Sequence, residues 1–422
     1  MEIGAYIKLH RIKQEMTQAE LAEGIVSSAY LSKIENEKTD ASLNVISLLC
    51  TRLGIQLDNG SDEEVREKLQ KWYGMLSSDY DMNEMVQNYQ ELNKVMYDNH
   101  SADSLVMFEI HKVRYFLVIG KIDEALRQVN KLTEMSDTFD TLHQFYWYKF
   151  KGNYSTAQNE FNQAMRMYEA AEEKLNQLEL PEEEVADLQY TIAVTHSKLR
   201  NTLEAIDYAE KAIATFRVTY NFSRCAQCHV VLGISYRRIR MYDKAIKNYN
   251  LAKHLGELKQ NPQIIQLTNQ NLGYLYSTVG ETEKAIYHYE EIIKEQELFL
   301  FERILAATSL IKEYYNINNF DKAKEMVKMS LKLLHEPEDQ DTFQLFFYIA
   351  YTYKYAINQE ASKFESLVID EFIPYLKKHK DYANLVIYAN MLAHHFEGNN
   401  RYKESVKYYK LANSTYEELI SL

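Results

Sequence analysis

The stretch Gln270–Ile292, QNLGYLYSTVGETEKAIYHYEEI, decides the fold of this chain. It predicts two packed helices whose seam holds the small residues Gly273 and Ala285 and the aromatic residue Tyr289. Small residues let two helices approach closely, and aromatic rings fill the space between them. One polar side chain, Asn271, lies beside this seam, on the side that a stack of such hairpins turns inward. Its amide is therefore a candidate for ligand recognition.

The same hairpin recurs along the chain. Small residues repeat at intervals of about forty residues, and a seam-filling residue follows each of them four positions later. The pairs are Ala125 and Val129, Ala164 and Tyr168, Ala205 and Ala209, Ala245 and Tyr249, Ala285 and Tyr289, and Ala323 and Val327, and a last hairpin is predicted from Leu392, Ala393, Ser405 and Tyr409. Such units bury their faces only by stacking. Residues 136–422 are therefore predicted to form a right-handed superhelix of tetratricopeptide repeats.

The first helix of each pair is expected to form a concave inner wall. The repeat register predicts that the wall is lined by Asp187, Tyr190, Lys198, Gln227, Arg237, Arg238, Leu267, Gln270, Asn271 and Thr308. Side-chain amides can pair with both N–H and C=O of an extended peptide, and arginine can hold a carboxylate through two bonds. The wall is therefore predicted to bind a short peptide. The alternative is that Asn271 caps or bridges neighbouring helices and that the arginines are solvated.

Composition agrees with an all-α chain. Among 422 residues there are only 4 prolines and 12 glycines, and no strand-like alternation is evident. Neither a long apolar run nor a signal-peptide core is present, and 3 cysteines cannot build a disulfide framework, so a cytoplasmic protein is expected. The net charge of −13 is spread along the chain, which excludes a general nucleic-acid-binding surface. Any DNA binding must come from a local arrangement.

Residues 1–60 predict a small helical domain. Thr17 and Glu20 form a capping box that begins a short helix with Ala19 and Leu21 on its apolar face. After a tight turn, a second helix spans 28–36, with its apolar residues buried. A short helix, a tight turn and a second helix with a small, polar and basic outer face is the geometry that enters a DNA major groove. The outward residues of the second helix are Ser28, Tyr30, Ser32 and Lys33.

The segment between the two regions predicts a connecting helical bundle. A helix-breaking sequence at 59–62 marks a domain boundary, and an amphipathic helix follows with Leu69, Trp72, Tyr73 and Leu76 on one face. Further helices and a first imperfect repeat extend to residue 135. The predicted domains are therefore 1–60, 61–135 and 136–422.

Residues 17–24 (TQAELAEG), 27–38 (SSAYLSKIENEK) and 43–55 (LNVISLLCTRLGI) resemble the Xre-like helix-turn-helix family. By that resemblance, Gln18 would brace the first helix against a backbone phosphate, while Ser28, Tyr30 and Lys33 would face bases or phosphates. Because the domain is not basic, specific binding would need a homodimer or higher homo-oligomer that reads two half-sites.

Nearly the whole chain resembles the Gram-positive quorum-sensing receptors of the Rap, Rgg, NprR, PlcR and PrgX group. The resemblance rests on LQKWYGML at 69–76, FKGNY at 150–154, RCAQCHVVLGISY at 224–236 and the stretch around Asn271, and the layout is most like the NprR members. It implies a transcription regulator that binds a short re-imported signalling peptide, with Asn271 gripping the ligand backbone. A second activity that it implies is capture, or dephosphorylation, of a response regulator of the sporulation phosphorelay, near EIHKVRYF at 109–116.

Two further groups of side chains are candidates for chemical sites. Cys225, Cys228 and His229 lie in a predicted helix without a second ligand pair at zinc-site spacing, which favours a buried structural role. His394 and His395 adjoin no metalloprotease motif and are predicted to be helix surface. No phosphate loop or nucleophile elbow is present. The sequence therefore predicts no enzyme, no cofactor and no metal.

Overall fold

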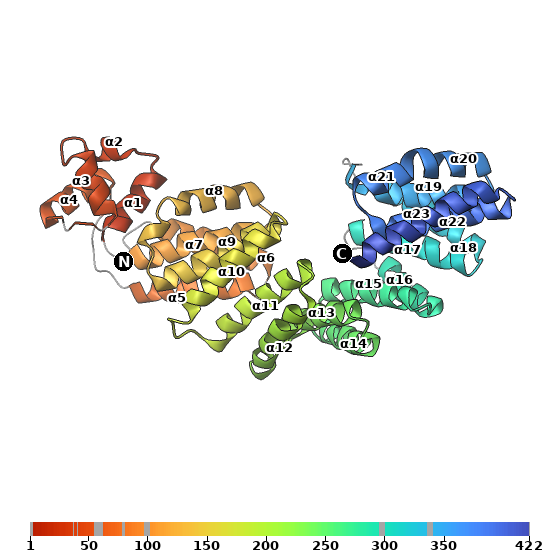
Figure 1. Ribbon diagram of the computed structural model, residues 1–422. Helices are drawn as coiled ribbons and strands as arrows, with labels where there is room; N and C mark the ends of the chain where they lie inside the picture. Colours follow the sequence, from red (N-terminus) through yellow and green to blue (C-terminus); the bar gives the residue numbers. More distant parts are fainter. Residues whose placement is uncertain are drawn as a thin grey trace. The chain divides into compact units, whose positions relative to one another are not determined.

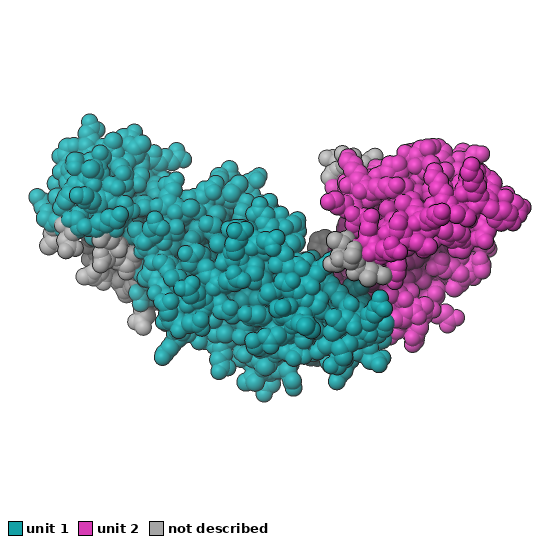
Figure 2. Space-filling view, in the orientation of Figure 1, with its two compact units in different colours: residues 1–260 teal, residues 261–422 magenta. Residues whose placement is uncertain are grey.

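The computed structural model describes residues 3–36, 38–39, 41–54, 62–77, 81–96, 102–294, 300–335 and 341–421. Every regular element in these ranges is a helix, as predicted, and none of the helices is long and apolar enough to cross a membrane. The chain packs as two compact units, residues 1–260 and 261–422, coloured separately in Figure 2. Residues 59–61 of the predicted hinge lie outside the described ranges, so the boundary between the first two domains stays a prediction.

The first unit contains fourteen α-helices and one 3₁₀ turn within its described residues (Figure 1). The helices are α1 Ile3–Lys13, α2 Gln18–Ala22, α3 Ser28–Glu35, α4 Leu43–Arg52, α5 Asp62–Ser77, α6 Met82–Val95, α7 Ala102–Val118, α8 Ile122–Thr133, α9 Thr141–Ala157, α10 Phe161–Leu175, α11 Glu182–Lys198, α12 Thr202–Val218, α13 Phe222–Arg238 and α14 Tyr242–Leu258, and the turn η1 is Ser136–Thr138.

The second unit continues the pattern of paired helices. Its elements are α15 Pro262–Thr278, α16 Thr282–Lys294, α17 Leu300–Asn316, α18 Phe320–Leu334, the 3₁₀ turn η2 Asp341–Phe343, α19 Gln344–Ile357, α20 Ala361–Ser366, the π-helical stretch η3 Leu367–Phe372, α21 Ile373–Lys378, α22 Tyr382–Gly398 and α23 Tyr402–Ser421.

Helices α1 to α4 form the small N-terminal domain. The predicted capping box is present: the Thr17 hydroxyl accepts the Glu20 backbone N–H, and the Glu20 carboxylate accepts the Thr17 N–H at 2.6 Å. Ala19 was expected on the apolar face but is exposed, because only Leu21 and Ala22 of this five-residue helix reach the core. Helix α1 crosses α3 so closely that a Cβ atom on Gly4 would lie 1.9 Å from the Ile34 carbonyl oxygen.

The predicted seam of the repeats is confirmed. All six small residues, from Ala125 to Ala323, are fully buried. In three hairpins a glycine of the first helix lies under a tyrosine ring of the second, and a Cβ atom on the glycine would lie 2.4–2.6 Å from that ring. These pairs are Gly152 with Tyr168, Gly233 with Tyr249, and Gly273 with Tyr289. The hairpin of α11 and α12 has Ala193 and Ala209 at the corresponding positions, and both are buried. In these three hairpins, a tyrosine ring on the second helix therefore packs against a glycine on the first helix.

One hairpin of the array was missed by the sequence reading. Helix α19 pairs with α20, η3 and α21, between the hairpin that contains Ala323 and the last pair, α22 with α23. Phe364, buried at 2 % exposure, stands where the repeat register calls for a small residue. The second helix of this hairpin also includes the π-helical stretch η3. A large ring at the register position and an irregular helix together hide this unit from a pattern of alanines.

We predict that Gly273→Ala lowers the stability of the chain by about 1–3 kcal/mol, because the new methyl group overlaps the Tyr289 ring. Urea unfolding followed by circular dichroism measures the loss. Gly398→Ala is the matched control, because nothing lies within 4 Å of a Cβ atom there. The double variant Gly273→Ala with Tyr289→Ala recreates the pairing of Ala193 and Ala209, so it is expected to lose less stability than the sum of the single variants. Additive losses would contradict this packing rule.

Candidate functional site

The outer face of α3 is the candidate DNA-reading surface. Ser28 and Lys33 are exposed, whereas Tyr30 and Ser32 are half-buried. The helix begins at Ser27, whose hydroxyl accepts the Tyr30 backbone N–H at 3.2 Å. Lys33 and Ser28 thus stand free on a capped helix, while Tyr30 also packs against the domain core.

A buried ion pair holds α3 against α1 and α2. The Glu35 carboxylate is fully buried and accepts hydrogen bonds from Arg11 Nε at 2.6 Å and from the Arg11 terminal nitrogen at 2.9 Å. The Gln18 amide nitrogen donates to the same carboxylate at 2.7 Å. The sequence placed Gln18 at a phosphate, and that role stays a prediction; in this structure its amide nitrogen is used inside the domain. The pair fixes the angle at which α3 is presented.

In the first unit, helices α7, α9, α10, α11 and α13 line a hollow of about 280 Å³. Three predicted wall residues meet there: Asp187, Tyr190 and Gln227. The lining also includes Arg114, Asn153, Thr156, Tyr168, Thr191, Val194 and Arg224. The Tyr168 hydroxyl donates to Asn153 Oδ1 at 2.8 Å, and the Arg224 guanidinium lies 5.0 Å from the centre of the Tyr190 ring. Burial raises the pKa of Tyr190 to about 12, so this hydroxyl is neutral and can donate.

Asp187 is the anionic centre of this hollow and is shared by two cations. Its carboxylate lies 2.8 Å from Lys149 Nζ and is bonded to the Arg224 guanidinium. Burial alone would raise the pKa of the Asp187 carboxyl, but Arg224 and Lys149 hold it well below its usual range. Lys149 also pairs with Glu184 at 3.0 Å, and the Tyr73 hydroxyl donates to Glu184 at 2.7 Å. Four helices, α5, α9, α11 and α13, are tied together by this network.

Arg114, on α7, is the cation of this hollow that is left without an acid. Within the described residues it has no carboxylate within 4 Å, and its Nε donates only to the Leu76 carbonyl oxygen at 3.4 Å. Burial lowers the pKa of the Arg114 guanidinium, which means that its charge is poorly solvated. Arg114 is half-buried and its charge has no carboxylate in contact among the described residues, so an anionic group that entered the hollow would be bound favourably.

Three further predicted wall residues, Arg237, Arg238 and Lys198, lie near the C-terminal ends of α11 and α13. Arg238 is exposed and donates to the Ser197 carbonyl oxygen, at the C-terminal end of α11. Arg237 is half-buried and hydrogen-bonds the Tyr249 hydroxyl. Lys198 is exposed at the last turn of α11. Arg238 thus stabilises the end of the preceding first helix, as cations do at helix C-termini.

In the second unit, α15 carries a row of amides. Gln266 Nε2 and Gln270 Oε1 are both buried, and neither has a hydrogen-bond partner among the described residues. They are one helical turn apart, and one is a donor and the other an acceptor. Beside them, the Asn271 amide nitrogen donates to the Leu267 carbonyl oxygen at 2.8 Å. The Asn271 side chain is half-buried. Leu267 itself is 44 % exposed. This face of α15 therefore carries one donor and one acceptor without partners among the described residues, beside the exposed side chain of Leu267.

Thr308, which was predicted to line the wall, is buried. It is 3 % exposed, and its hydroxyl donates to the carbonyl oxygens of Ile304 and Leu305 at 2.9 Å and 3.0 Å. Thr308 therefore packs within α17 and offers no free hydroxyl proton.

Several site residues were missed by the sequence reading. Lys149, Arg224 and Gln266 each lie on the first helix of a repeat, as the predicted wall residues do. Arg224 is three residues before Gln227 and bonds to its amide oxygen at 2.9 Å, so extending the wall by one turn would have found it. Arg114 lies in the stretch 109–116, which the family resemblance assigns to a response-regulator contact and not to the peptide wall.

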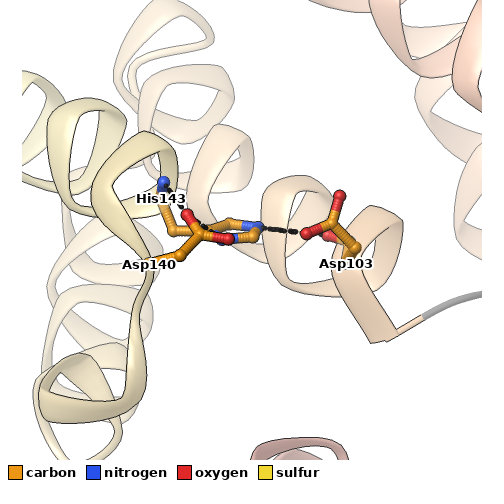
Figure 3. A group of neighbouring side chains, drawn as sticks. All are labelled: Asp103, Asp140 and His143. Carbon is orange, nitrogen blue, oxygen red and sulfur yellow. Dashed lines mark hydrogen bonds and ion pairs between the residues drawn. The ribbon is translucent and has the colours of Figure 1, made fainter. Parts of the chain in front are cut away.

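One group of side chains could be considered for a metal ion: Asp103, Asp140 and His143 (Figure 3). The two carboxylates flank opposite nitrogens of the buried imidazole, with Asp140 2.8 Å from Nδ1 and Asp103 3.6 Å from Nε2. Asp140 also accepts the His143 backbone N–H at 2.9 Å and caps α9. Its hydrogen bond to His143 lowers the pKa of Asp140 to about 2. The group ties the start of α7 to the start of α9.

The other constellations are structural in character. Cys225 and Cys228 are buried free thiols, as predicted. His395 pairs with Glu365 at 3.0 Å, and His394 is exposed beside Tyr409. His111 is buried and stacks on Tyr73 at 4.4 Å between ring centres. Burial lowers the pKa of His111 to about 3, so it is neutral.

Comparison with family models divides the chain as its helices do. The model described as "Helix-turn-helix" matches residues 7–59, which contain α1 to α4. The model described as "Soluble NSF attachment protein, SNAP" matches residues 111–316, which lie in the array of helical hairpins. The first match agrees with the domain that Glu35 holds together.

Individual proteins are similar over most of the chain. "Transcriptional activator NprA" of Geobacillus stearothermophilus is 34 % identical over 95 % of this chain and 100 % of its own length. "Response regulator aspartate phosphatase A" of Bacillus subtilis is 24 % identical over 64 % of this chain and 70 % of its own length. The crystal structure of NprR in complex with its cognate peptide NprX is 18 % identical, with a TM-score of 0.56 over 85 % of this chain and 100 % of that one.

We predict that Glu35→Gln destabilises the N-terminal domain by about 3–5 kcal/mol, because Arg11 is left buried without a counter-charge. Hydrogen exchange read by mass spectrometry reports this as faster exchange of the α1 and α3 amides, with the amides of α9 to α14 unchanged. Glu23→Gln makes the same chemical change on an exposed side chain and is the control. Equal exchange in the two variants would show that the buried pair does not hold α3 in place.

Proposed function

The chain belongs to the family of Gram-positive quorum-sensing regulators that includes the transcriptional activator NprA, and on that premise we propose that it is a peptide-responsive transcription regulator. The N-terminal domain binds double-stranded DNA, and the repeats bind a short signalling peptide in the cytoplasm. The protein acts by binding and catalyses no reaction. The similarity to the transcriptional activator NprA supports the regulatory role, and the similarity to NprR in complex with its cognate peptide supports the choice of ligand.

The DNA-binding part of the proposal rests on α3. Its two exposed polar residues, Ser28 and Lys33, would contact bases or phosphates, and Tyr30 and Ser32 would extend that contact from half-buried positions. Residues 1–60 contain six Lys and Arg against eight Asp and Glu, so phosphate attraction of one domain is weak. A homodimer that reads two half-sites would supply the missing affinity and specificity.

The single observation that carries peptide binding is the row of amides on α15. Gln266 and Gln270 present a buried donor and a buried acceptor without partners in the described part of the chain. Buried polar atoms of this kind are rare and costly. The backbone of an extended peptide has a C=O and an N–H at spacings that suit such a pair, and Asn271 lies next to them. Ligand binding would remove the cost.

The hollow of the first unit, taken by itself, would bind an anionic group. Arg114 is available for an anion, while Asp187 is already neutralised by Lys149 and Arg224. Helix α7, which carries Arg114, also contacts α1 of the DNA-binding domain. The α1 face there is buried: His10 is 6 % exposed, and burial lowers its pKa to about 4. An anion at Arg114 would therefore act on the helix that supports the DNA-binding domain.

We predict that Asn271→Ala weakens peptide binding by about tenfold or more, since one amide bond to the ligand backbone is lost. Isothermal titration calorimetry with the peptide that co-purifies with the protein, identified by mass spectrometry, measures the change. Asn88→Ala is a matched control, because Asn88 is also half-buried on a helix and donates to the carbonyl oxygen four residues earlier at 2.8 Å. Unchanged affinity in Asn271→Ala would remove this residue from the site.

A second candidate function is capture of a response regulator. It is favoured by the similarity to response regulator aspartate phosphatase A, which spans most of that protein. The surface would be the bundle of α5 to α8, and sequestration or dephosphorylation would be a further activity of the same chain. The described residues of this bundle include the neutral, buried His111, which is closed to solvent.

The two functions are separable in the full chain. Ser28→Glu with Lys33→Glu places acidic groups on the outer face of α3, and we expect it to abolish DNA binding measured by fluorescence anisotropy. Retention of a phosphorylated response regulator from the host on the immobilised variant should be unaffected. Loss of both activities in this variant would contradict two independent surfaces.

A further inference from the structure

The second unit contains a hollow of about 440 Å³. Its lining residues lie between Lys312 and His395, so the amide row of α15 is not part of it. It is lined by the first helices of three successive hairpins, α17, α19 and α22, together with Phe364 of α20. Its polar lining includes Lys312, Asn316 and Asn390, and its apolar lining includes Ile387 and Met391.

Lys312 is a cation without a counter-ion. It is half-buried, and among the described residues no carboxylate lies within 4 Å of its ammonium group and no hydrogen bond satisfies it. The neighbouring Glu313 is 2 % exposed and accepts from the Ser277 hydroxyl at 2.5 Å. Glu365, on the same helix as Phe364, is already paired with His395 at 3.0 Å and Arg401 at 2.7 Å. No described carboxylate lines the hollow, so Lys312 gives its lining a positive group.

Two amides accompany this cation. Asn390 is half-buried and Asn316 is exposed, and neither side chain has a hydrogen bond to another described residue. Each offers two N–H donors and one acceptor. A single ammonium group together with two amides suits a carboxylate attached to a peptide backbone, because the amides can pair with the last N–H and C=O.

Part of the remaining wall is apolar, and Tyr315, His394 and His395 also line the hollow. Ile387, Met391 and Ala356 line it with the buried Phe364 ring, and Tyr353 is 3 % exposed at its floor. Burial raises the pKa of Tyr353, so this hydroxyl adds no negative charge. A bare phosphate would leave this apolar surface in contact with water, whereas an aliphatic side chain beside the carboxylate would cover it.

We propose that this hollow binds the C-terminal carboxylate of an extended peptide whose last side chain is aliphatic. Lys312 holds the carboxylate, Asn316 and Asn390 hold the last peptide group, and Met391 and Ile387 contact the side chain. This is a second recognition site, and it does not depend on the peptide site at Asn271.

The test uses the full chain labelled with ¹³C at the methionine methyl groups, with the Met391 signal assigned from Met391→Leu. N-acetyl-glycyl-glycyl-leucine and its C-terminal amide are titrated separately at millimolar concentrations. The acid is expected to shift the Met391 signal. The affinity of the amide is expected to be lower by about tenfold or more, because the charged hydrogen bond to Lys312 is missing.

Lys312→Met and Asn390→Asp should each reduce the response to the acid by about tenfold, since one removes the cation and the other adds a repelling charge. Lys328→Met alters an exposed lysine of α18 outside the hollow and is the control. Asn271→Ala should leave the Met391 response unchanged, which separates this site from the one proposed above. Equal shifts with acid and amide, an unmoved Met391 signal, or a full response in Lys312→Met would each overturn the proposal.

Discussion

The close approach of two helices within each hairpin is the constraint on which the rest of the structure depends. In three hairpins it requires a glycine on the first helix beneath a tyrosine ring of the second helix, at Gly152, Gly233 and Gly273. Where the ring is replaced by Ala209, the first helix carries Ala193. Because interiors are close-packed, this complementarity sets the spacing of each pair and leaves the opposite face of the first helix free for polar groups.

Those polar groups are arranged by charge in a way that separates scaffold from recognition. Asp187 is a scaffold residue, because its ion pairs with Lys149 and Arg224 join the first helices of three successive hairpins. Arg114 and Lys312 have no such acid within the described ranges, and Gln266 and Gln270 have unpaired amide atoms. A stable protein tolerates a few such groups when a ligand satisfies them. Recognition is therefore assigned to what is left unpaired, and stability to what is paired.

The hairpins were predictable because their pattern is local. A small residue and a ring four positions later determine the contact between α15 and α16 without knowledge of the rest of the chain. The partners of Asp187 were not predictable in this way, because Lys149 and Arg224 lie on neighbouring first helices and their pairing depends on how the hairpins stack. The same holds for Arg238, which reaches the end of α11 from the next repeat. The hairpin that begins with α19 was not predicted from the sequence, because Phe364 takes the place of the small residue in the repeat pattern.

We expect peptide and DNA binding to be coupled through one chain, because α7 carries Arg114 and also contacts α1. Coupling between two ligands is reciprocal, so the factor by which the peptide changes DNA affinity must equal the factor by which DNA changes peptide affinity. The most direct measurement is fluorescence anisotropy of a genomic DNA fragment selected by the protein, with and without the co-purified peptide, alongside the converse peptide titration. We expect equal factors of about fivefold or more in both titrations. DNA affinity that is identical with and without saturating peptide would contradict it.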